Sequence, residues 1–116
     1  MTEGGTSRSR ADLPARHERP VIDDAALLAA RHADRLLGEA RARGLTRWVT
    51  YLAPLPDRLR DDHLGELRAT ALRSRAAYGV KDSVRDVLPP ELTEPFLVSI
   101  DRLIRELNRE AHRTRS

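Results

Sequence analysis

The stretch TEPFLVSIDRLIRELNREA, residues 93–111, carries the most regular apolar pattern in the chain. Its apolar side chains recur every three or four residues, the spacing that places them on one face of an α-helix. These are Phe96, Ile100, Leu103, Ile104, Leu107 and Ala111. Thr93 suits the capping position before such a helix, and Pro95 would then lie in the first turn, where no backbone N–H is needed. The pattern predicts a long amphipathic helix that starts near Thr93.

Two stretches nearer the N-terminus show the same periodicity. Residues 23–43 form a helix whose acidic start suits the positive helix end, and Gly44 suits the left-handed stop position. Its apolar face consists of Ala25, Ala29, Ala33, Leu36 and Ala40. Residues 56–78 are predicted to form the third long helix, with proline at its first position. Its stripe consists of Leu59, His63, Leu67, Ala71 and Ser74.

Two short helices link these three, at residues 46–53 and 83–88, and both end at prolines. No sustained alternation of apolar and polar residues indicates a β-strand. We therefore predict an all-α fold, a small bundle of three main helices with two short linking helices. Residues 1–20 are expected to be a disordered tail, 21–113 a single helical domain, and 114–116 a frayed end.

Length and composition limit the functions open to the chain. Its 116 residues suffice for one small domain, and 3% aromatic content means that aliphatic side chains must build the core. Cysteine is absent, which excludes disulfides, thiol nucleophiles and thiolate metal sites. The longest apolar run is AALLAA, residues 25–30, too short to cross a membrane, and the first ten residues lack the apolar core of a secretory signal. We expect a cytoplasmic protein without a membrane partner.

Catalytic and metal-binding patterns are also missing. The four histidines, His17, His32, His63 and His112, show no i, i+4 pair and no zinc-ligand spacing. Ser74 and Ser83 stand in no nucleophile motif, and no glycine-rich loop leads from a strand into a helix. The sequence therefore predicts no enzyme, no cofactor and no metal site.

A basic stretch, LRATALRSRAAYGVK at residues 67–81, admits two interpretations. Its candidate nucleic-acid contacts are Arg68, Arg73, Arg75 and Lys81, since arginine binds phosphate well. However, the first half of the same predicted helix is acidic, and acids early with bases late is the order that the helix dipole favours. The net charge is only +3, and nearly every basic residue is arginine. An accessory nucleic-acid-binding or regulatory role is therefore the alternative hypothesis.

A protein interface is the leading hypothesis. Trp48 and Tyr51 share one side of the short helix 46–53, and such aromatic residues often anchor interfaces. Ile100, Leu103 and Leu107 follow the rhythm of a dimer seam. Further apolar residues, Leu64, Leu72, Leu97 and Val98, widen the apolar faces beyond what a three-helix core can hide. We therefore expect a small non-enzymatic helical interaction module that self-associates or docks on a protein partner.

Overall fold

The computed structural model describes residues 15–115, and all regular secondary structure among them is helical. The elements are the 3-10 turn η1 (Arg16–Glu18) and the helices α2 (Pro20–Ala42), α3 (Thr46–Leu52), α4 (Leu55–Arg58) and α5 (Leu64–Ala76), followed by the 3-10 turn η2 (Val84–Asp86) and the helix α6 (Pro90–Arg115). The all-α prediction is confirmed. Residues 1–14 of the predicted tail lie outside the described part of the chain.

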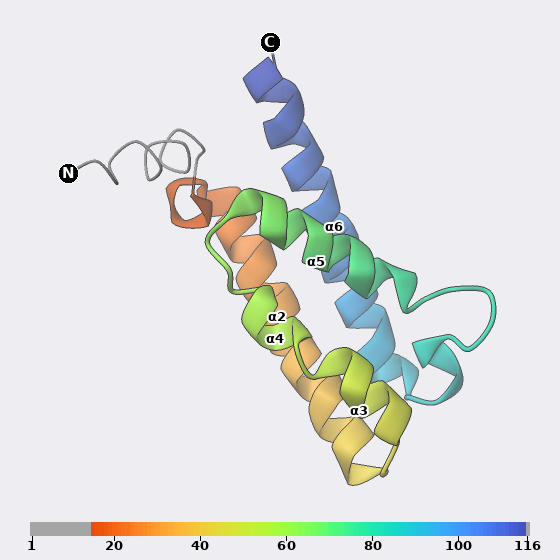
Figure 1. Cartoon of the computed structure of the whole chain (residues 1–116). Helices are drawn as coiled ribbons and strands as arrows, with labels where there is room; N and C mark the ends of the chain where they lie inside the picture. The colour runs from red at the N-terminus through yellow and green to blue at the C-terminus, as the bar shows by residue number, and fades with distance from the viewer. Residues whose placement is uncertain (1–14, 116) are drawn as a thin grey trace.

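The two longest helices, α2 and α6, lie side by side and antiparallel along the length of the molecule (Figure 1). On α2, most residues of the face toward the core are alanine, interrupted by Ile22, Leu36 and Leu37, and each of these alanine side chains is fully buried: Ala25, Ala26, Ala29, Ala30, Ala33 and Ala40. Small residues let two helix backbones approach closely, so the larger side chains of α6 fill the space between them. On α6, those side chains are Phe96, Ile100, Leu103 and Leu107.

A second layer, made of α3, α4 and α5, covers one face of the α2–α6 pair. Helix α5 crosses α6, and α3 and α4 pack against α2 (Figure 1). Five leucine and alanine side chains from this layer are fully buried, namely Leu52, Leu55, Leu59, Leu67 and Ala71. The core therefore lies between the two layers, and the opposite face of the α2–α6 pair receives no third layer from residues 15–115.

The single helix predicted over residues 56–78 is wrong, because the chain breaks between α4 and α5. His63 has an extended backbone, with φ −83° and ψ 120°, and its side chain accepts a hydrogen bond from the Glu66 N–H. The Asp61 carboxylate accepts the His63 N–H at 2.8 Å. His63 therefore acts as the N-cap of α5 rather than as a member of a continuous apolar stripe. The same residue forms an isolated antiparallel bridge with Ala15.

The predicted start of the last helix is also wrong, since α6 begins at Pro90 and places Pro95 inside the helix. Thr93 is buried rather than capping, and its carbonyl accepts a hydrogen bond from the Tyr78 hydroxyl. Proline at position 90 suits a helix start as well as Pro95 would have done. The helix continues to Arg115, beyond the predicted limit of 113.

For α2, the predicted stop at Gly44 is confirmed and the predicted start near Asp23 is wrong. Gly44 has φ +66°, so it occupies the left-handed stop position as expected. The helix starts at Pro20, ahead of Asp23, whose carboxylate pairs with Arg16 at 2.8 Å. Residues 15–19 were expected in the disordered tail, but η1 is fixed by a hydrogen bond from the Arg16 N–H to the Asp62 carbonyl. The described structure thus includes six residues, 15–20, that were expected in the tail.

Candidate functional site

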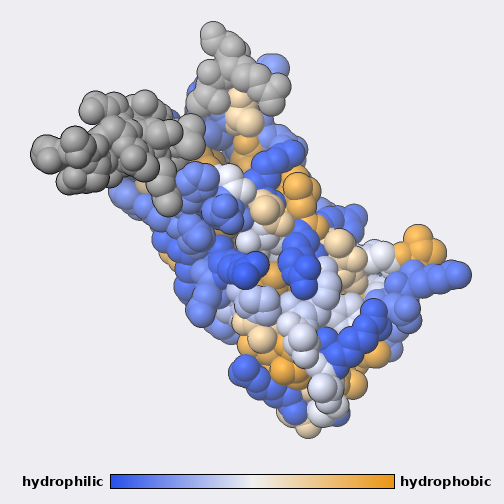
Figure 2. All heavy atoms as spheres, viewed as in Figure 1, coloured by the Kyte–Doolittle hydropathy of each residue, from blue (hydrophilic) through white to orange (hydrophobic). Residues whose placement is uncertain are grey.

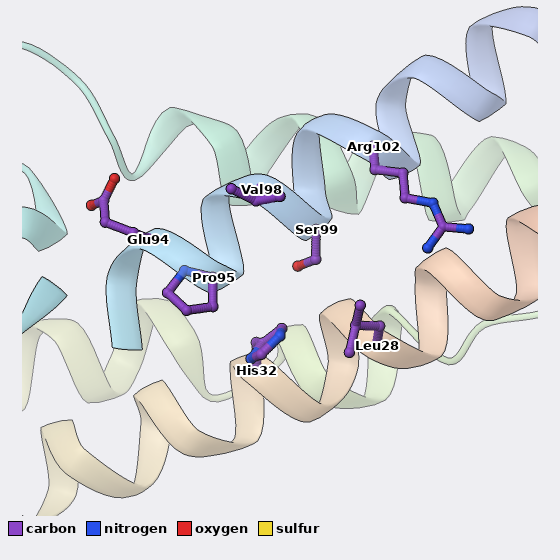
Figure 3. A pocket seen from close by; sticks show the side chains of 7 residues that line it. All are labelled: Leu28, His32, Glu94, Pro95, Val98, Ser99 and Arg102. Carbon is purple, nitrogen blue, oxygen red and sulfur yellow. The ribbon is translucent and has the colours of Figure 1, made fainter. Parts of the chain in front are cut away.

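A groove of about 530 Å³ runs between α2 and α6 on the face that the second layer leaves uncovered. Its lining comes from these two helices alone: Leu28, His32, Glu94, Pro95, Val98, Ser99 and Arg102. In Figure 3, Leu28 and His32 rise from α2 toward α6, while Pro95 and Ser99 extend from α6 toward α2. Helix α5 lies behind the pair in this view. We call this feature the α2–α6 groove.

The groove is lined mainly by apolar groups. Leu28 and Pro95 are half-buried, and Val98 has 68% of its surface exposed. An aliphatic side chain this open gains free energy when it is covered, at roughly 25 cal/mol per Å² removed from water. The opposite side of the molecule, over α4 and α5, is mostly hydrophilic with small separate hydrophobic spots (Figure 2). The groove therefore offers a mainly apolar surface between two helices.

Two of the polar lining residues, Glu94 and Ser99, are already hydrogen-bonded within the chain. Arg85 donates to both Glu94 carboxylate oxygens, at 2.9 and 2.8 Å, and Thr93 donates to the same group at 3.0 Å. The bonds from Arg85 hold the pKa of Glu94 below its ordinary value. The Ser99 hydroxyl donates to the Phe96 carbonyl at 2.8 Å. Glu94 is thus a neutralised acid at one end of the groove, and Ser99 is no free nucleophile.

His32 stands in a positive electrostatic environment. Partial burial lowers its pKa most, and the charges of Arg35 and Arg31 lower it further. With a pKa below the ordinary value of 6.5, the imidazole is neutral at physiological pH. His32 therefore contributes a polar but uncharged surface to the groove.

Four arginines supply positive charge on and beside this face of the α2–α6 pair. Leu28, Arg31 and Arg35 share one side of α2 at i, i+3 and i+7, and Val98, Arg102 and Arg105 share one side of α6 at i, i+4 and i+7. Among residues 15–115, no carboxylate lies within ion-pair distance of these arginines. We refer to Arg31, Arg35, Arg102 and Arg105 as the rim arginines.

The acidic residues close to the groove do not outweigh these charges. Glu94 is paired with Arg85, and Glu106 is paired with Arg109 at 2.9 Å. Asp24, one turn before Leu28, and Glu91, one turn before Pro95, are exposed and take part in no ion pair among the described residues. Four rim arginines against these two acids leave the groove with a basic surplus.

The four residues predicted as nucleic-acid contacts do not gather into one patch. Arg68 donates to the Asn108 side chain at 2.5 Å, and Arg75 pairs with Asp101 at 2.9 Å, so both tie α5 to α6. Arg73 lies over the Tyr51 ring, 4.4 Å from its centroid. Lys81 is exposed in the loop after α5. The three arginines thus hold other elements of the fold together.

The residues predicted as a protein interface lie mostly in the core. Ile100, Leu103 and Leu107 are buried beneath α2 and α5, and Trp48 has only 7% of its surface exposed. Tyr51 is half-buried, and its hydroxyl donates to the Arg73 carbonyl at 2.5 Å. Within one copy of the chain, these side chains are already covered. Of the further apolar residues, Val98 and Leu72 remain exposed, at 68% and 46%.

Sequence reasoning missed most of the groove. The position of Val98 outside the apolar stripe of its helix is a sequence signal for an exposed apolar residue. The pairing of Leu28 and His32 with Pro95 and Arg102 depends on how α2 and α6 align across the fold, and a single sequence does not reveal it. No cluster of three or more potential metal ligands occurs within residues 15–115.

No helix within residues 15–115 is both long and apolar enough to span a membrane. The chain matches no protein-family model, no curated protein and no solved structure.

Proposed function

We propose that this chain is a non-enzymatic docking module that binds a segment of a partner protein in the α2–α6 groove. The observation that carries the proposal is the aliphatic surface of Leu28, Pro95 and Val98 beside arginines that form no ion pair with any of residues 15–115. Exposed apolar surface framed by charged groups is typical of protein-binding sites. A helix or extended segment placed there would complete the missing third layer of the fold.

The polar chemistry of the groove supports binding over catalysis. A nucleophile needs a base within hydrogen-bond reach, yet the Ser99 hydroxyl is used by the Phe96 carbonyl. Glu94 is engaged by Arg85 and Thr93. Among the other lining residues, His32 is the proton carrier, and its ring forms no hydrogen bond with any of residues 15–115 through which a proton could pass.

An aliphatic surface also favours a polypeptide over a nucleic acid. Proteins that bind single strands stack bases on aromatic rings, and those that bind duplexes place side chains along phosphates and base edges. The four aromatic residues of the chain lie outside the groove lining: Trp48, Tyr51, Tyr78 and Phe96. The alternative role through Arg68, Arg73, Arg75 and Lys81 gains no support from a shared surface.

An unbiased peptide-display selection against the full-length chain tests the proposal. Selected peptides are titrated into isotope-labelled protein, and we expect the largest amide shift changes in α2 and α6, near Leu28 and Val98. Val98→Asp should weaken binding by at least about tenfold, because it places an unpaired charge against the apolar segment. Val80→Asp is the matched control, since Val80 is fully exposed on the loop after α5 and lies outside the groove.

Two results would contradict the proposal. One is a selection that yields no binder above background although the protein is folded by circular dichroism. The other is a set of binders whose shift changes map outside α2 and α6 and whose affinity ignores Val98→Asp.

A further inference from the structure

We infer that the occupant of the α2–α6 groove is a short, acidic, amphipathic helix belonging to a partner protein. This inference rests on the proposed docking function and adds the chemistry of the partner. Three features of the groove lead to it: its length, the charge of the rim arginines and the composition of its lining.

The length of the groove suits about three helical turns. The lining and rim on α6 run from Glu94 to Arg105, which at 1.5 Å per residue covers about 17 Å. A surface between two antiparallel helices is the place where a third helix packs its own ridge of side chains. Such a helix would direct apolar side chains at i, i+3 or i+4, and i+7 toward Leu28, Pro95 and Val98.

The charge around the groove decides the sign of the partner. The rim arginines belong to both helices, so a helix lying between α2 and α6 would have arginines along its flanks. Glutamate or aspartate at the flanking positions of that helix would pair with them, whereas lysine there would be repelled. Asp24 and Glu91 reduce the basic surplus without reversing it.

The same charge argues against a second copy of this chain as the occupant. In a two-fold symmetric interface the same patch meets itself, so the rim arginines of one copy would face those of the other. Like charges brought together at an interface oppose association. The groove therefore suits a partner of opposite charge.

Two displayed helix libraries provide the test. Both share a three-turn helical frame with aliphatic residues varied along the seam; one carries Glu or Gln at the flanking positions, and the other carries Lys or Gln. Selection against the full chain should enrich the acidic library at least about tenfold over the basic one. Binding of a recovered acidic peptide, followed by fluorescence anisotropy, should weaken as salt rises.

A charge exchange then assigns the effect to the rim. The double variant Arg35→Glu with Arg102→Glu should lose at least about tenfold in affinity for the acidic peptide and should gain affinity for its lysine counterpart. Arg58→Glu is the control, because Arg58 is exposed on α4, outside the groove, and makes no ion pair with any of residues 15–115. Circular dichroism verifies that each variant is folded.

The outcomes distinguish failure of the acidic-partner inference from failure of the proposed docking function. Equal enrichment of both libraries, or preference for the basic one, with shift changes at Leu28 and Val98, overturns the acidic partner while docking at the groove stands. Binders that map elsewhere, or none at all, overturn both. Preferential binding of a labelled oligonucleotide, or a doubled mass by light scattering that Val98→Asp abolishes, would assign the groove to nucleic acid or to a second copy.

Discussion

Gly38 and Gly44 differ in backbone conformation. Gly38 lies within α2, and a β-carbon added there would meet nothing within 4 Å. Gly44 also has open space around it, but its φ is +66°. A residue with a β-carbon avoids that backbone conformation, so only one of these glycines is required by the fold.

The two glycines form a matched pair for substitution. Gly38→Ala should raise the free energy of unfolding by about 0.5–1 kcal/mol, because alanine loses less entropy in a helix. Gly44→Ala should lower it by about 1–2 kcal/mol through strain at the left-handed position. Urea denaturation of both variants measures this. Equal effects of the same sign would show that the end of α2 is not held in the left-handed conformation.

Two histidines should give the free energy of unfolding a maximum near pH 6.5. The hydrogen bond and charge of Asp62 raise the pKa of His17, so its contribution is present below 6.5 and lost as pH rises through the folded value. Burial lowers the pKa of His32, so its contribution is complete above 6.5 and lost as pH falls. His17→Gln should flatten the decline on the alkaline side, and His32→Gln the decline on the acid side.

Denaturation at intervals between about pH 5.5 and 8 tests these opposite slopes in a range where the carboxylates stay ionised. Identical pH profiles for the wild type and both variants would contradict the assignment. A variant that flattens the other side of the profile would contradict it as well.

Among the helices, α6 was the easiest to predict and α5 the hardest. The stripe of α6 is long and regular, and the structure buries Phe96, Ile100, Leu103 and Leu107 as the spacing indicated. The break before α5 depends on His63, which bridges to Ala15 and bonds to Asp61 and Glu66. The stop combines local capping by Asp61 and His63 with a distant contact to Ala15, and helical periodicity alone reveals neither.

The groove was hidden from the sequence for the same reason. Its two sides come from α2, which ends at Ala42, and α6, which starts at Pro90, so residues 43–89 separate them along the chain. Amphipathic patterns show which side of each helix faces the core. They leave open which outward residues of the two helices become neighbours, and that alignment creates the site.

The alanine face of α2 gives a prediction about the packing of the two long helices. Ala33→Leu should lower the free energy of unfolding by about 1–3 kcal/mol, since the side chain is fully buried and extra carbons would separate the helices. Ala42→Leu, at the exposed end of α2, should change it by less than about 0.5 kcal/mol. Thermal or urea unfolding compares them. A neutral Ala33→Leu would mean that α2 and α6 are not in close contact at this turn.

At the level of the whole molecule, the apolar stripe of α6 serves the core of a single chain. Leu103→Ala should cost about 2–5 kcal/mol of stability, because Leu103 is fully buried within one copy. Leu72→Ala, at a half-exposed leucine on α5, should cost less than about 0.5 kcal/mol. The free protein should then have the 13.1 kDa mass of one chain in light scattering.

A dimer seam at Leu103 would produce a different result. The native protein would have twice the mass of one chain, and Leu103→Ala would halve it. The elongated shape, with extents of 50 × 30 × 23 Å, makes elution volume a poor substitute for scattering here.

Trp48 is the only indole of the chain, and it lies on α3, in the layer that covers the other side of the core. Its ring is 7% exposed, with the Tyr51 ring 5.5 Å away and the Arg47 guanidinium 5.3 Å from its centre. The protein therefore carries its own optical reporter, whose emission should shift to the red when the chain unfolds. Because the indole does not line the α2–α6 groove, its emission wavelength should stay constant while a peptide binds there.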